Sequence, residues 1–167
     1  MTVTAVRKDP HALTMTLDAE FDASPERVWE LWSDPRQLER WWGPPTYPAT
    51  FTKHDLHPGG RVEYHMTGPE GDQPRGYWEV QEVDPPNSLS VRDGFANDDG
   101  SPNTEMPEGE MRVTIEEIAP GRTRMSILST FPSTETMEQL LAMGQEEGMI
   151  QAAGQIDAIL AEDSVRN

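Results

Sequence analysis

Asp93 is the acid of this sequence whose surroundings best suit it to chemistry. It lies in a strand-like run with Leu89, Val91 and Phe95, which share its face because side chains two residues apart point the same way. Where that face borders a cavity, loss of hydration raises the pKa of a carboxyl group and makes it a candidate general acid or base. A hydrogen-bonded structural acid near a strand end gives the same pattern. Asp93 is therefore a candidate catalytic residue with a structural alternative.

The four histidines, His11, His54, His57 and His65, give little support for other catalysis. None lies in a nucleophile motif, and the sequence has neither a G-x-S-x-G motif nor a cysteine. His54 and His57 are three residues apart, which on a strand directs their rings to opposite faces. His65 is out of phase with its apolar neighbours and is expected to face solvent. We predict no metal site and no cofactor.

The loop from Phe95 to Gly100 is similar in part to a calcium-binding loop. Asn97, Asp99 and Gly100 fit the third, fifth and sixth positions of such a loop. Phe95 occupies the position of the first carboxylate and Met106 the position of the bidentate glutamate, so the ligand set is incomplete. An acidic loop at the mouth of a cavity is the expected structure.

Composition limits the partners and the location of the protein. With 13 Lys and Arg against 30 Asp and Glu, the 167 residues carry a formal charge of -17, which repels nucleic-acid phosphates and anionic lipids. No apolar run approaches the roughly 18 residues of a membrane span, and residues 1–14 lack the apolar core of a secretory signal. We expect a single domain over residues 1–167, with its core at about 11–162, in a cytoplasmic protein.

Periodicity predicts an antiparallel sheet with helices on one face, an α+β plan. Residues 11–21 alternate as a half-buried strand. Ser24 with Pro25, and Asp34 with Pro35, are helix-start signals that predict two short helices ending at about residues 33 and 42. About six strands follow, at 49–56, 61–66, 76–83, 88–95, 110–118 and 123–131. The phases of the strands at 76–83 and 88–95 conflict unless a β-bulge intervenes.

Residues 134–162 form the longest segment without proline and are predicted to be one continuous helix. Its apolar stripe has a spacing of three or four residues and consists of Met137, Leu141, Gly144, Gly148, Ala152, Ile156 and Leu160. A glycine inside a helix costs about 1 kcal/mol relative to alanine. Two glycines on the buried face therefore indicate either very close packing or space that is kept open beside the helix.

Several segments, in this order and spacing, are similar to those of a known family. They are Ser24 to Trp32, Arg40 to Pro44, Asp55 to Arg61, Glu82 to Pro86, Val113 to Ile115 and Gly121 to Arg124. From about residue 13 to residue 160 the chain resembles the START-like, helix-grip superfamily, and within it the family named for homology to the activator of the heat-shock protein 90 ATPase. The resemblance implies a curved seven-stranded antiparallel sheet that grips a long C-terminal helix, with two short helices after the first strand and a cavity between sheet and helix.

The resemblance also bears on activity. Many members of the superfamily bind lipids, sterols, polyketides or other apolar molecules in the cavity, and some are cyclases or other enzymes, but the family shares no single catalytic motif. Members often have tryptophan after the helix glycine, where this chain has Gly148 followed by Met149. The inner wall of the cavity is therefore expected to differ here. The family name also suggests a chaperone partner.

Apolar residues on the inward faces of the predicted elements suggest a ligand pocket. Methionine adapts to irregular shapes, and tyrosine and tryptophan present a polar tip within an apolar wall. Core packing is the alternative for each residue alone; as a set, the predicted ligand-binding residues are Trp41, Tyr64, Met66, Trp78, Phe95, Met111, Val113, Met125, Ile127, Met137, Leu141, Gly144 and Gly148. The predicted function is to bind a small hydrophobic or amphipathic molecule. The alternatives are a cyclase- or hydrolase-type enzyme that uses the same cavity, and an interaction module that contacts a chaperone or forms a homodimer.

Overall fold

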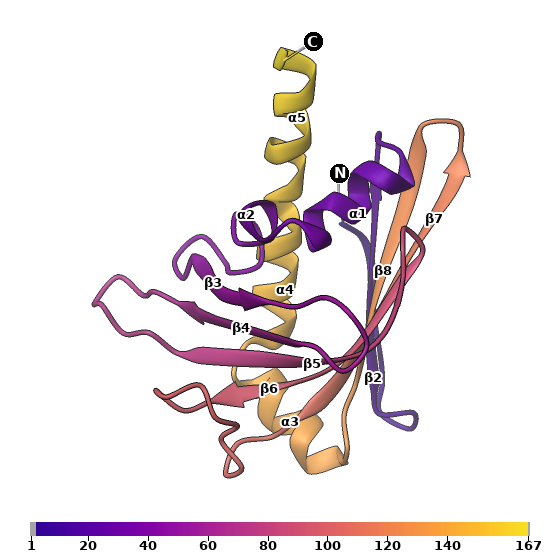
Figure 1. Ribbon diagram of the computed structural model, residues 1–167. Helices are drawn as coiled ribbons and strands as arrows, with labels where there is room; N and C mark the ends of the chain where they lie inside the picture. The colour runs from indigo at the N-terminus through magenta and orange to yellow at the C-terminus, as the bar shows by residue number, and fades with distance from the viewer. Residues whose placement is uncertain (1–2, 167) are drawn as a thin grey trace.

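The computed structural model describes residues 3–166, which form one antiparallel sheet and five helices (Figure 1). The strands are β1 (Val3–Asp9), β2 (Thr14–Phe21), β3 (Ala49–His54), β4 (Arg61–Met66), β5 (Arg75–Asp84), β6 (Ser88–Ala96), β7 (Gly109–Ala119) and β8 (Arg122–Thr130). The helices are α1 (Pro25–Ser33), α2 (Pro35–Leu38), α3 (Thr134–Ala142), α4 (Gln145–Gly154) and α5 (Ile156–Arg166). The α+β class and the antiparallel sheet are as predicted.

The sheet is strongly curved around the C-terminal helices. Its strand order is β1-β2-β8-β7-β6-β5-β4-β3, so only the pairing of β2 with β8 joins strands that are distant in sequence. In Figure 1, β3 to β6 run across the view while β2, β7 and β8 stand steeply beside them, and α4 and α5 form a column on the inner side. Strands β2 and β8 alternate strictly between buried and half-buried residues, which is the period of a sheet with one face on the core.

The sheet has eight strands, and the prediction of seven was wrong because β1 was not recognised. This strand lies at the edge of the sheet and pairs only with β2. Its sequence, VTAVRKD, ends in charged residues and lacks a clean alternation, as is typical of edge strands that resist pairing with other chains. Arg7 is paired with Asp18 of β2 at 2.6 Å, and Lys8 with Glu146 of α4 at 2.6 Å.

A β-bulge resolves the conflict of phase between β5 and β6. The register shifts between Val80 and Glu82, with Val83 opposite Leu89 on one side of the shift and Val80 opposite Val91 on the other. Both pairs can therefore lie on the inner face, and Trp78 lies opposite Asp93. The bulge that the sequence required is confirmed.

Two capped helices connect β2 to β3. The Ser24 hydroxyl accepts a hydrogen bond from the Arg27 amide at 3.2 Å, and the Asp34 carboxylate accepts one from the Arg36 amide at 2.9 Å. Helix α2 ends at Leu38, earlier than predicted, and the chain continues in turns. Those turns carry the tryptophans Trp41 and Trp42 into the open end of the curved sheet.

The C-terminal segment is not one helix, and that prediction was wrong. Gly144 adopts φ +92°, a left-handed conformation that ends α3 and starts α4, and Gln155 interrupts the segment again before α5. Glycine reaches this conformation without steric cost, which explains its presence at the break. The Gln155 side-chain amide donates hydrogen bonds to the carbonyls of Gly43 at 2.7 Å and Trp41 at 3.3 Å, which fixes α4 and α5 to the loop after α2.

The core lies between the sheet and the helices and has an aromatic centre. Trp32, Trp41 and Trp78 are fully buried, and Trp42 meets all three of them, with ring centroids 5.0 to 5.8 Å apart. The Trp41 indole donates a hydrogen bond to the Leu31 carbonyl at 2.9 Å. This packing closes one end of the space that the sheet encloses.

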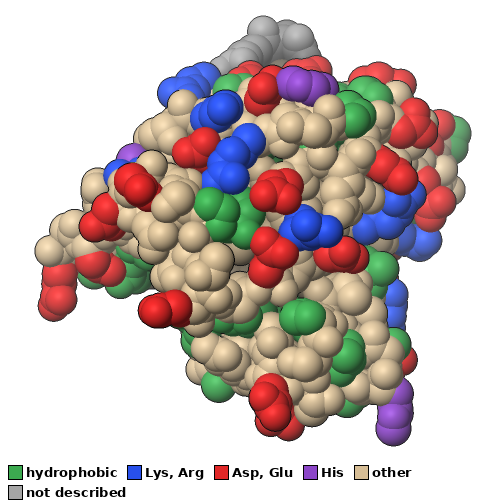
Figure 2. All heavy atoms as spheres, turned by 60° about the horizontal axis from the view of Figure 1, so that its bottom comes forward, with side chains coloured by type: hydrophobic (Ala, Val, Ile, Leu, Met, Phe, Trp, Pro, Cys, Tyr) green, Lys and Arg blue, Asp and Glu red, His purple; other side chains and the backbone are tan. Residues whose placement is uncertain are grey.

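The surface reflects the acidic composition. Figure 2 shows acidic and basic side chains interspersed on the face it presents, with hydrophobic side chains between them. Within residues 3–166, no helix is long and apolar enough to cross a membrane.

Candidate functional site

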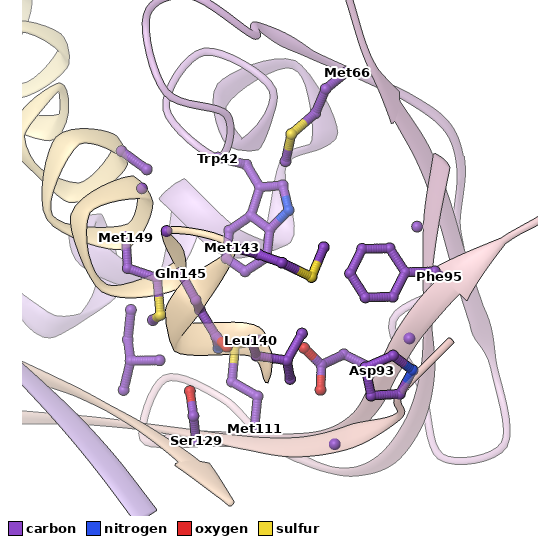
Figure 3. Close-up of a pocket in the computed structure, with 18 of the residues that line it drawn as sticks. Trp42, Met66, Asp93, Phe95, Met111, Ser129, Leu140, Met143, Gln145 and Met149 are labelled. Atoms are coloured by element: carbon purple, nitrogen blue, oxygen red, sulfur yellow. The ribbon is translucent and has the colours of Figure 1, made fainter. Parts of the chain in front are cut away.

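A pocket of about 330 Å³ lies between the inner face of the sheet and the corner where α3 meets α4 (Figure 3). Its walls come from β4 to β8, from the loop that carries Trp42, and from α3 and α4. Most of the wall is apolar, and its volume is at the lower end of the range usual for small-molecule sites. The pocket is therefore suited to a compact ligand.

The lining includes many of the residues predicted to contact a ligand. These are Trp41, Tyr64, Met66, Phe95, Met111, Ile127, Gly144 and Gly148, together with the candidate acid Asp93. They come together because β4, β6, β7 and β8 direct one face inward and α4 packs across that face.

Five of the predicted residues lie elsewhere. Trp78, Val113 and Met125 are completely buried in the main core, where the Trp32 indole approaches the Met125 sulfur at 3.2 Å, and they do not line this pocket. Met137 packs with Met15 and Phe131 in a smaller cluster, and Leu141 packs against that cluster. The strand residues lie deeper along the same inward faces as the lining residues, so their phase alone could not separate them from the lining.

Other lining residues are absent from the predicted set. They are mainly Trp42, Ser129, Leu140, Met143, Gln145 and Met149. The break at Gly144 shifts the phase of α3 relative to α4, so Leu140 and Met143 face the pocket in place of Leu141. Met143 is 55% exposed and lies between Trp42 and Phe95 in Figure 3, at the mouth of the pocket. Met149 follows Gly148, which also lines the pocket.

Asp93 is one of three charged residues in the lining, with Arg75 and Glu110. Its carboxyl group points into the pocket in Figure 3, is half-buried, and has no partner side chain among the described residues. Burial, with a smaller contribution from the negative charge of Glu108, raises the pKa of Asp93 to about 6. The group can therefore exchange a proton near neutral pH.

Tyr64 and Trp42 add polar tips beside Asp93. The Tyr64 hydroxyl lies over Gly76 of β5, where any Cβ would collide with it, and burial raises the pKa of Tyr64 to about 12. The Trp42 Nε1–H is buried and has no partner at hydrogen-bond geometry among the described residues, although it lies near enough to the Tyr64 hydroxyl to oppose part of that rise in pKa. The Oε1 atom of Gln145, on the opposite wall, is also buried without a partner. Unpartnered buried polar groups are unusual, and these two can form hydrogen bonds with a bound molecule.

The two glycines of the C-terminal segment have different roles. Gly144 supplies the left-handed turn between α3 and α4. Gly148 is helical, and a Cβ placed on it would meet nothing within 4 Å. Of the two reasons considered for these glycines, open space therefore applies to Gly148, and a backbone requirement applies to Gly144.

The histidines do not line the pocket, whereas the polar loop after β6 contributes Pro107 to it. The His54 ring nitrogen lies 2.9 Å from the Trp32 carbonyl, while His57 is exposed and meets Asp55 at 2.9 Å. His65 is only half-exposed, and its Nδ1 is buried, so the expectation that it faces solvent was wrong. In the loop after β6, Asp99 accepts hydrogen bonds from the Ser101 amide and hydroxyl. No cluster of potential metal ligands occurs among the described residues.

Comparisons with known proteins extend these observations. Residues 22–161 match the family described as "Activator of Hsp90 ATPase homolog 1-like protein". A crystal structure of a protein from Mycobacterium smegmatis is 49% identical, with a TM-score of 0.87, and the match covers 95% of this chain and 96% of that one. A solution structure of a protein from Arthrobacter aurescens is 50% identical, with a TM-score of 0.92, over 96% of this chain and 93% of that one.

More distant structures share the fold alone. A protein from Staphylococcus epidermidis is 24% identical, with a TM-score of 0.82, over 96% of this chain and 95% of that one. No curated protein matches the sequence.

Proposed function

The chain belongs to the family of Activator of Hsp90 ATPase homolog 1-like proteins, and from that premise we propose that it binds one small amphipathic molecule in the pocket between the sheet and α4. The ligand is held with its apolar body against the methionines and aromatic rings and with a polar group toward Asp93. Binding of this kind sequesters the ligand from water without changing it chemically.

The observation that carries this proposal is the combination of an apolar wall with buried polar atoms that lack partners. Removal of apolar area from water contributes about 25 cal/mol per Å², so the lining favours an apolar ligand. The Gln145 Oε1 lacks a hydrogen bond, the Trp42 Nε1–H has no partner at hydrogen-bond geometry beyond its loose approach to the Tyr64 hydroxyl, and Asp93 lacks a partner side chain. A dry, fully packed interior would leave neither the space beside Gly148 nor these unpaired groups.

Native mass spectrometry of gently purified protein tests the proposal directly. We expect a mass above that of the denatured chain by one small molecule, which organic extraction then releases for identification. Recovery of protein without a bound molecule, together with failure of the neutral dye Nile red to bind to it, would count against the proposal. A stoichiometric protein partner recovered without any small molecule would favour the interaction module instead.

A proton-transfer enzyme of cyclase or hydrolase type is the second candidate, and one observation favours it. Asp93 has a pKa of about 6 in a pocket that can position a reactive chain. If Asp93 moves a proton, turnover of a candidate substrate has a pH dependence that Asp93→Asn abolishes while the fold stays intact. Indifference of turnover to this substitution would exclude Asp93 from that role.

A further inference from the structure

The geometry points to a ligand class: we propose that the pocket selects a small amphipathic amine in its protonated form, with Asp93 as the residue that determines this specificity. The inference rests on the proposed function, because it names the chemistry of the molecule held at the same site. It goes further in assigning a charge to that molecule.

The acceptors in the pocket lack side-chain donors among the described residues. Asp93 ends in two carboxylate oxygens directed into the pocket, and no Lys, Arg or His pairs with it among the described residues. On the opposite wall, the Gln145 Oε1 is buried without a partner. An ammonium group brings three donors and a positive charge, and can therefore serve the carboxylate and a second acceptor. A ligand carboxylate would bring more acceptors and a second negative charge.

Aromatic rings surround the same space. Trp42 stands edge to face with Tyr64, with ring centroids 6.2 Å apart, and Phe95 lies two residues from Asp93 on the same face of β6. The faces of such rings attract a cation within about 6 Å. A carboxylate beside several aromatic rings is a combination that favours ammonium groups over anions.

Two features that would favour an anion are offset. Arg75 is the basic residue that contributes to the lining, but it alternates with the inward-facing Gly76 and Trp78 on β5, so its side chain leaves from the other face. The N-terminus of α4 also reaches the pocket, and its positive end would attract an anion. Its first turn already carries two acidic residues, Glu147 and Glu146, of which Glu146 pairs with Lys8.

Amine affinity should depend on pH through the ionisation of Asp93, which the charged and titratable groups around it influence. The acidic side chains near Asp93 are Glu108, which pairs with Arg92 at 3.5 Å, and Glu110; Tyr64 stays neutral, and the side chain of Arg75 leaves from the other face of the sheet. A bound ammonium group favours ionised Asp93, so amine affinity reaches about half its full value at a pH of about 6 and falls further below it. Between pH 7.5 and pH 5 the affinity should fall about tenfold, because the ionised fraction of a group with that pKa falls by this factor.

A matched series of probes tests the inference on the intact chain. Phenylbutylamine, phenylbutanol and phenylbutyric acid share one apolar body and differ in the head group. We expect titrations followed by NMR at the amides of Asp93, Phe95 and Gly148 to give an amine affinity at least about tenfold above that of the alcohol, with the acid weakest. In Asp93→Asn the preference for the amine should disappear while alcohol binding persists.

The control variant is Glu138→Gln, which removes the same charge from the exposed face of α3 and should leave the preference unchanged. If the alcohol binds as tightly as the amine, or the acid binds best, the inference is overturned while the proposed function stands. If none of the three shifts the pocket amides, the proposed function fails with it. Circular dichroism of each variant separates lost binding from lost folding.

Discussion

Replacement of Gly148 by leucine separates the space beside α4 from the stability of the helix. A Cβ at Gly148 meets nothing within 4 Å, and the residue is helical, so the larger side chain enters open space without backbone strain. Leucine is a better helix former than glycine by up to about 1 kcal/mol. Gly148→Leu should therefore raise the free energy of unfolding by that amount, which corresponds to about 2–4 °C in Tm for a domain of this size.

The same substitution should weaken ligand binding because the leucine side chain occupies part of a pocket of about 330 Å³. Overfilling a packed apolar site costs about 1–3 kcal/mol, which is roughly a five- to 150-fold increase in Kd. The assay measures the binding of Nile red to each variant, alongside its thermal unfolding. Gly154→Leu is the matched control: it lies on the same helix with open space around it, but outside the lining.

Both leucine variants should gain stability, and only Gly148→Leu should lose ligand. If Gly148→Leu unfolds while Gly154→Leu does not, the glycine serves close packing of α4 against the sheet, and the reasoning from open space is refuted. Equal binding by both variants would show that the pocket does not extend to Gly148.

Three further predictions concern Asp93, Gly144 and Met125. The pKa of Asp93 in the folded protein, about 6, lies above the ordinary 3.8, so protonated Asp93 stabilises the fold and this stability is lost as pH rises through 6. The free energy of unfolding of Asp93→Asn, measured in urea, should therefore exceed that of the wild type by roughly 2 kcal/mol at pH 7.5, after allowance for partial exposure. Below pH 4 the two should be almost equal. Gly144→Ala should lower the free energy of unfolding by about 1–2 kcal/mol because its φ is +92°, whereas Gly148→Ala should raise it, as thermal unfolding would show. Met125→Ala should lower the free energy of unfolding by about 2–5 kcal/mol, because the Met125 side chain is buried against Trp32. The ligand affinity of the folded protein should not change. An affinity change as large as that of Gly148→Leu would show that Met125 contacts the ligand.

The local sequence determined most of the sheet and the helix starts. Alternation along β2 and β8 fixes which side chains face inward, since the period of two is a property of the strand alone. Ser24 and Asp34 specify their helices through caps that act within three residues. The conflict of phase between β5 and β6 required a bulge, and the register shift between Val80 and Glu82 supplies it.

Features that depend on partners far along the chain were decided by the tertiary structure. Strand β1 is completed by its pairing with the edge of β2, a partner that its own sequence does not reveal, and Lys8 at its end meets Glu146 of α4. The break at Gly144 turns α3 across the mouth of the pocket. The apolar spacing of the sequence continues unchanged through Gly144, so periodicity alone does not predict the break.

The site shows the same division between local and distant causes. Sequence phase identified an inward face that contains Asp93, Phe95, Met111 and Met125 alike. Depth along that face, set by the packing of α1 and its Trp32, then placed Met125 in the core and left Met111 and Asp93 at the pocket. The sequence therefore determined which side chains point inward, because that follows from strand geometry. Only the tertiary structure decided which of them meet empty space, because a cavity is defined by the elements that fail to fill it.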